Sequence, residues 1–102
     1  MIKVLVKEPG QKFEQQEIEN KLEEFQELVG GYIETVTIAT DLVLICNEEG
    51  RIKGSEYNCE VLGREFVGTI VLAGVKKDEF SDCPISPRFA EGFLSRRGLR
   101  NV

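Results

Sequence analysis

Residues 20–47 read NKLEEFQELVGGYIETVTIATDLVLICN, and this stretch decides the fold. Asn20, with Glu23 three residues later, resembles a capping box and predicts that a helix begins there. The following apolar residues are spaced three and four apart, as on one face of an amphipathic helix: Leu22, Phe25, Leu28 and Val29. Gly30 suits the left-handed position that ends a helix. The stretch therefore opens with a short helix.

Two strands are predicted after this helix. Residues 32–39 are rich in β-branched side chains, and Thr40-Asp41 then marks a turn. Residues 42–46 are apolar at every position, which favours a central strand covered on both faces. The glycine pair at 30–31 follows the helix, where the negative end of the helix dipole repels anions. A phosphate-binding loop is therefore excluded at this position.

The flanking segments add further strands. Residues 2–7 alternate as in a strand, Pro9-Gly10 predicts a turn, and residues 13–18 are expected to return as the second strand of a hairpin. Residues 66–74 predict a second buried strand. The chain is expected to be irregular from Gly74 to Pro84.

A C-terminal helix is predicted from Ser86, because serine followed by proline is typical of the first helical positions. Arg96 and Arg97 suit the negative end of its dipole, and Gly98 is the expected cap. We therefore expect a single α+β domain over residues 1–102. It should contain an antiparallel or mixed sheet of about five strands, one short helix packed on the sheet, and the C-terminal helix.

The composition bounds the class of protein. The chain has 102 residues, of which 41% are hydrophobic and 30% charged, as in an ordinary globular domain. No apolar run approaches the roughly 20 residues of a membrane span, and Met1-Ile2-Lys3 leads directly into a predicted strand. We therefore expect a cytoplasmic protein that does not bind a membrane.

The charge distribution is uneven. The net charge of −5 argues against general nucleic-acid binding, which depends on clustered lysine and arginine. Residues 14–27 carry six glutamates and one lysine, whereas residues 84–102 carry four arginines and one glutamate. Three of these glutamates lie outside the apolar stripe of the predicted helix: Glu23, Glu24 and Glu27. They form either a solvated helix face or a surface for a protein partner.

The usual catalytic and metal-binding constellations are missing from the sequence. There is no histidine, and the three cysteines are widely spaced, so neither a zinc site nor any other metal or cofactor is expected. The acidic residues Asp78, Glu79 and Asp82 do not have the spacing of an EF-hand calcium loop. Adjacent carboxylates such as Glu48 and Glu49 rarely converge on one reacting atom. We therefore assign no catalytic residue.

Several segments together resemble the DUF3846 family of small proteins from bacteria, phages and mobile elements. The similarity lies in the opening strand and turn (IKVLVKEPG), in the LVGGYIE segment, in the turn LICNEEG and in GTIV. It covers about residues 1–75, so residues 76–102 are interpreted as a C-terminal elaboration. The motif positions shared with the family are Asn47, Glu48, Glu49, Gly50 and Asn58.

The resemblance implies no established activity, so it transfers no catalytic residue. The shared asparagines and glycine have a structural explanation in turn chemistry, and the alternative is a binding site in the long polar loop 47–64. The leading hypothesis is a small non-catalytic binding or regulatory protein of an accessory type, acting on a host or phage protein. One alternative is a phage counter-defence inhibitor that imitates DNA or sequesters a nucleotide signal. Another is an enzyme using a carboxylate of that loop or Cys59.

Overall fold

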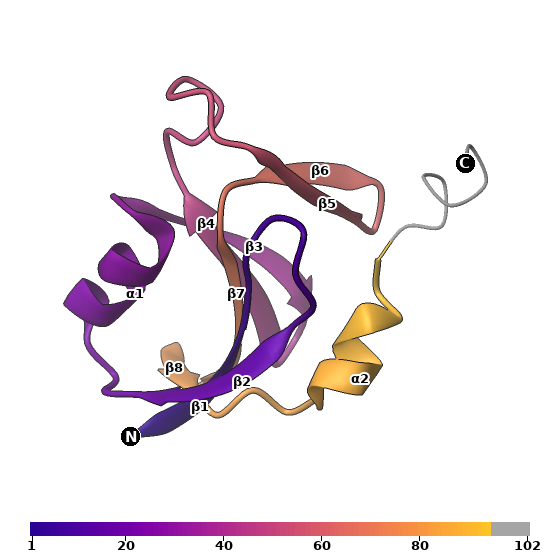
Figure 1. Ribbon diagram of the computed structural model, residues 1–102. Helices are drawn as coiled ribbons and strands as arrows, with labels where there is room; N and C mark the ends of the chain where they lie inside the picture. Colours follow the sequence, from indigo (N-terminus) through magenta and orange to yellow (C-terminus); the bar gives the residue numbers. More distant parts are fainter. Residues whose placement is uncertain (95–102) are drawn as a thin grey trace.

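The computed structural model describes residues 1–94. A six-stranded antiparallel sheet runs in the order β2-β1-β7-β4-β3, with β8 paired to β7, and β5 and β6 form a separate hairpin (Figure 1). In chain order the elements are β1 (Ile2–Lys7), β2 (Glu14–Ile18), α1 (Leu22–Val29), β3 (Ile33–Ala39), β4 (Leu42–Asn47), β5 (Tyr57–Val61), β6 (Arg64–Val67), β7 (Ile70–Lys76), β8 (Glu79–Ser81) and α2 (Pro87–Glu91). The predicted α+β class is confirmed, with six strands in the main sheet where about five were expected.

The main sheet separates two hydrophobic cores. Helix α1 covers one face, and the β5–β6 hairpin with α2 covers the other (Figure 1). Strand β4 contributes to both: Leu42 and Leu44 point toward the hairpin side, whereas Val43 and Ile45 point toward α1. The prediction that this apolar run is central and covered on both faces is confirmed.

The N-terminal hairpin forms as predicted. β1 and β2 pair antiparallel with Ile2 opposite Ile18, and Gly10 adopts the left-handed conformation with φ of 79° in the turn between them. At the other end of the chain, Ser86 Oγ accepts a hydrogen bond of 3.1 Å from the backbone of Phe89, which confirms the start of α2. The expected later part of this helix, with Arg96, Arg97 and Gly98, lies outside the described residues.

Helix α1 begins one residue later than predicted. Its N-cap position is Lys21, which makes no side-chain capping bond, so the predicted capping box at Asn20 and Glu23 is wrong. The side-chain nitrogen of Asn20 instead donates a hydrogen bond of 2.8 Å to the carbonyl oxygen of Phe80, which lies sixty residues further along the chain. The predicted apolar stripe is also narrower, because Leu22 is 52% exposed while Phe25 is fully buried. Gly30 ends the helix with φ of 81°, as expected.

The predicted strand 66–74 is divided in two. β6 ends at Val67 and β7 begins at Ile70, because Gly68 takes φ of 71° and donates its N–H to the carbonyl of Glu56 at 2.7 Å. The segment from Gly74 to Pro84, expected to be irregular, contains β8. A tight turn at Lys77 and Asp78, both with positive φ, brings β8 back onto β7.

The described helices are short: α1 has eight residues and α2 has five. Within residues 1–94, no helix has both the length and the apolar character that crossing a bilayer would require.

Candidate functional site

The turn after β4 is tied to the end of α1 by the side chain of Asn47. Its Nδ2 donates to the carbonyl oxygen of Val29 at 3.1 Å, and its Oδ1 accepts from the N–H of Glu49 at 2.7 Å. The N–H of Glu48 also donates to the carbonyl oxygen of Tyr32, at 2.8 Å. One asparagine therefore holds an otherwise exposed acidic turn in a fixed position against the last helical residue.

Gly50, another of the motif positions, is buried beneath this turn. A methyl group at Gly50 would lie 3.1 Å from a methyl carbon of Val67 and 3.5 Å from the carbonyl oxygen of Asn47. The Gly50 N–H donates to that same oxygen at 3.2 Å, and its carbonyl accepts from Ser55 at 2.9 Å. Close packing against the β6 strand therefore accounts for a glycine here.

Asn58 lies apart from the turn, inside the molecule on β5. Its Oδ1 accepts from Nζ of the buried Lys7 at 2.6 Å, and its Nδ2 donates to the carbonyl oxygens of Lys7 and Gly68 at 2.8 and 2.7 Å. These bonds join the end of β1 to the corner between β6 and β7. The five motif residues therefore form two groups: Asn47 to Gly50 in a surface turn whose glycine is buried, and Asn58 in the interior.

A hollow of about 190 Å³ lies between the C-terminal end of α1 and the acidic turn, and we call it the Tyr32 hollow. It is lined by Gln26, Gly31, Tyr32, Glu49 and Lys53. Glu49 and Lys53 form a loose ion pair with 3.9 Å between their charged atoms. The absence of a side chain at Gly31 keeps this space open, because a methyl group there would lie 2.9 Å from Nδ2 of Asn47.

Tyr32 and the three glutamates of α1 are all at least partly exposed, and we call these four residues the rim. The Tyr32 side chain is 67% exposed, Glu23 and Glu27 are exposed, and Glu24 is half-buried. Within the described part of the chain, none of these three glutamates takes part in an ion pair. The rim thus combines an exposed aromatic ring with negative charge that no ion pair among the described residues offsets.

Glu48 lines a different and smaller hollow from Glu49. This second hollow, of about 120 Å³, lies between the end of β4 and β6 and also contains Cys46, Arg51 and Arg64. Arg64 forms an ion pair of 3.0 Å with Glu34, and Arg51 donates to the carbonyl oxygen of Glu65 at 2.8 Å. The two adjacent carboxylates therefore serve separate surfaces and do not converge.

The cysteines are buried thiols. Burial raises the pKa of Cys59 above its ordinary value, although the positive charge of Lys7 partly opposes this effect. Burial likewise raises the pKa of Cys46 and of Cys83. Low thiolate content and poor access both disfavour nucleophilic reactivity. Among residues 1–94, no group of three or more side chains of the types His, Cys, Asp and Glu is arranged to hold a metal ion.

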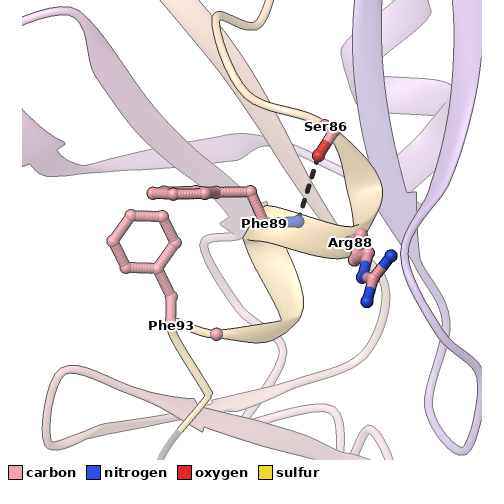
Figure 2. Close-up of a pocket in the computed structure, with 5 residues that line it drawn as sticks. Ser86, Arg88, Phe89 and Phe93 are labelled. Atoms are coloured by element: carbon pink, nitrogen blue, oxygen red, sulfur yellow. Dashed lines mark hydrogen bonds between the residues drawn. The ribbon is translucent and has the colours of Figure 1, made fainter.

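A mainly apolar hollow of about 500 Å³ lies on α2 and is shown in Figure 2. Its lining includes Phe89 and Phe93, whose rings meet edge to face with 5.7 Å between centroids. Phe89 is 62% exposed, whereas Ala90 is the residue of α2 that is buried. The last residue that lines this hollow is Phe93, and residues 95–102 lie outside the described structure.

Sequence reasoning did not single out Tyr32, Gly31 or Lys53 as site residues. Their grouping depends on the contact between the α1 end and a turn that follows two strands later, so no local pattern marks it. The only available signal was the predicted polar loop 47–64, which indicates a site without showing which residues share it. The structure corrects this prediction in part, because residues 57–61 form β5.

Comparison with known proteins identifies the family. The family model described as "Domain of unknown function (DUF3846)" matches residues 2–96. The match includes most of the segment that the sequence resemblance had set apart as a C-terminal elaboration. No curated protein and no solved structure matches the chain. Since the family model covers nearly the whole chain, this protein belongs to the DUF3846 family.

Proposed function

We propose that this protein is a non-catalytic binding protein that holds a basic surface of a partner protein through the Tyr32 hollow and the glutamates of α1. The observation that carries the proposal is the exposed ring of Tyr32, five residues after Glu27 in the chain, together with α1 glutamates that make no ion pair within residues 1–94. Tyrosine is enriched among residues that dominate protein–protein binding energy, and charge complementarity guides such partners together.

Helix stability does not account for the placement of Glu27. Glu23 and Glu24 lie in the first turn of α1, where negative charge suits the helix dipole. Glu27 lies in the last turn, where it opposes the dipole, and the last turn has no basic residue to offset it. Glu23 and Glu27 are also like charges at i and i+4, which destabilise a helix by about 0.2–0.5 kcal/mol. A binding role supplies a reason for an arrangement that stability disfavours.

The rigidity of the rim favours binding. Asn47 joins the helix end and the turn through two hydrogen bonds, so Tyr32 and Glu49 are presented in a fixed geometry. Preorganised surfaces lose less conformational entropy when they bind. The region therefore has the fixed, amphipathic character expected of a protein-binding surface.

Two observations support a non-catalytic role over the enzyme alternative. The adjacent carboxylates Glu48 and Glu49 line different hollows. Burial raises the pKa of Cys59, which lowers the fraction of nucleophilic thiolate at neutral pH. These were the groups on which a catalytic hypothesis depended.

The proposal is tested by placing a photo-reactive amino acid at position 32 in cells and identifying the cross-linked protein. The captured protein is then purified and its affinity measured for the native chain and for variants. We expect Tyr32→Ala and Glu27→Lys each to weaken binding at least about tenfold, equivalent to ~1.4 kcal/mol, and binding to weaken with salt.

Two matched controls distinguish the rim from the rest of the surface. Tyr57 is another exposed tyrosine, on β5, and Glu14 is another exposed glutamate, on β2. Tyr57→Ala and Glu14→Lys should leave the affinity unchanged. Native affinity of Tyr32→Ala and Glu27→Lys for the captured protein would show the proposal to be wrong. Displacement of the partner by duplex DNA would identify the glutamates as imitators of DNA phosphates.

A further inference from the structure

The two edges of the main sheet differ in their protection against pairing with another strand. β2 forms one edge, and two of its five residues are the exposed glutamates Glu14 and Glu17. β3 forms the other edge, and Glu34 is the single charged residue among its seven. Arg64 neutralises that charge at 3.0 Å. Charged side chains and prolines are the usual protection of an edge strand, and β3 has little of it before its bulge near Ala39.

The outward-facing backbone groups of β3 follow from one hydrogen bond. The carbonyl oxygen of Tyr32 accepts from Glu48 on the β4 side, and the same register continues along the two strands. Residues of an antiparallel strand alternate between those that bond one neighbour and those that face the other. Ile33, Thr35 and Thr37 therefore direct their N–H and C=O groups away from β4. In the part of the chain that the structure describes, no strand pairs with this side of β3.

We infer that β3 pairs antiparallel with β3 of a second copy of this chain, about a two-fold axis at Val36. In this register the outward groups of Thr35 face those of Thr37, and cross-strand threonine pairs are favourable. Glu34 lies opposite Ile38, so the two Glu34 carboxylates are far apart. Placing the axis at Thr35 would instead make those carboxylates diagonal neighbours, which disfavours that register.

The side chains of β3 also fit a symmetric partner. Val36 and Ile38 lie on the face that carries the β5–β6 hairpin and are half-buried against its core. A two-fold axis perpendicular to the sheet keeps that face on the same side in both copies. The apolar side chains of the two β3 strands would then pack beside one another and extend this core across the interface. This association uses a different surface from the Tyr32 hollow and does not depend on the proposed function.

A cysteine at the axis tests both the pairing and its register. Directly opposed residues of a non-hydrogen-bonded pair have Cα atoms about 4.5 Å apart, within the range that a disulfide accepts. Under mild oxidation Val36→Cys should therefore form a covalent dimer at least about tenfold faster than Thr35→Cys. In the proposed register the two copies of residue 35 are diagonal neighbours, and their separation of roughly 7–8 Å is too long for a disulfide. The native chain, with its three buried cysteines, is the control for background oxidation. Equal or faster cross-linking of Thr35→Cys would overturn the proposed register.

Light scattering during size-exclusion chromatography tests the association itself. We expect the native chain to elute with the mass of two chains and the double variant Thr35→Lys/Thr37→Lys with the mass of one, because two lysines on the open edge oppose pairing. The matched variant Gln15→Lys/Glu17→Lys places two lysines on the other edge and should remain dimeric. A monomeric native chain at high concentration, or a dimer that persists in the folded Thr35→Lys/Thr37→Lys variant, would overturn the inference. The cysteine experiment remains decisive if that variant fails to fold.

Discussion

Lys7 and Asn58 bond each other twice. The buried Nζ of Lys7 donates a hydrogen bond of 2.6 Å to Oδ1 of Asn58. Nδ2 of Asn58 donates a hydrogen bond of 2.8 Å to the main-chain oxygen of Lys7. The pair joins the first strand of the sheet to the β5–β6 hairpin. Because β5 has no backbone pairing with β1, this side-chain connection links the hairpin directly to the first strand.

Substitution of Asn58 should therefore be costly. Asn58→Leu removes the acceptor of a buried Lys7 side chain, and we expect the free energy of unfolding to fall by about 2–4 kcal/mol. Guanidinium denaturation measures this value. Replacing both partners, in Lys7→Met/Asn58→Leu, should lose less than the sum of the two single changes, because no amine is then left buried without its partner. Simple additivity would contradict the coupling.

Gly74 on β7 is expected to tolerate no side chain. A methyl group there would overlap the main-chain oxygen of Asp82 and lie 2.8 Å from Oγ of Ser81. Gly74→Ala must displace backbone, so it should cost at least about 3 kcal/mol or prevent folding. Gly10→Ala is the control: its φ is 79° but nothing lies within 4 Å, so it should cost only about 1–2 kcal/mol. Similar melting temperatures for the two variants would refute this prediction.

Gly31→Ala tests the role of the Tyr32 hollow with a single methyl group. The new carbon would lie 2.9 Å from Nδ2 of Asn47 and 3.3 Å from Nζ of Lys53, so the hollow narrows and the rim shifts. We expect partner affinity to fall about tenfold, or ~1.4 kcal/mol, in a calorimetric titration. Gly63→Ala, on the distant β5–β6 turn, should not change it. Full affinity of Gly31→Ala would remove the hollow from the binding surface.

The buried thiols predict a loss of stability at alkaline pH. Burial raises the pKa of Cys59 above its ordinary value of 9.0, so the folded protein holds this proton more tightly than the unfolded chain does. The resulting stabilisation is complete below that value and is lost as the pH rises through the folded-state pKa. Denaturation at a series of pH values from about 7 to about 10.5 should show stability falling more steeply in the native chain than in Cys59→Ala. Parallel curves would contradict the assignment.

The sequence predicted those parts of the fold that depend on local patterns. The apolar run from Leu42 to Cys46 indicates a strand buried on both faces, whichever strands it pairs with. Ser86 and Pro87 start a helix through contacts with residues next to them in the chain, so the sequence alone reveals it. The error at Asn20 has a physical reason: a side-chain amide can cap a helix or bond a distant carbonyl, and Phe80 provides that carbonyl. The division at Gly68 likewise depends on Glu56, which local periodicity does not reveal.

The candidate site was less accessible from the sequence than the fold. Asn47 could be identified as a turn residue, but its bond to Val29 exists only because the β4 end lies beside α1. Family resemblance grouped Asn58 with Asn47, whereas the structure separates an interior bond network from a surface turn. Tyr32 lies in the family-like segment LVGGYIE but no pattern marks it as a site residue, and its place in the proposed binding surface rests on its exposure next to a hollow.

The sheet order places β7 between two local hairpins, β1–β2 and β3–β4. Each hairpin can form from neighbouring residues, but pairs such as Leu5 with Leu72 must wait for the last long strand. During synthesis the strand edges of β1 and β4 that β7 later covers therefore stay open until Lys76 has left the ribosome. We expect stalled chains ending before β7 to be cleaved readily by added protease. The timing of β7 thus sets how long the growing chain is exposed to aggregation.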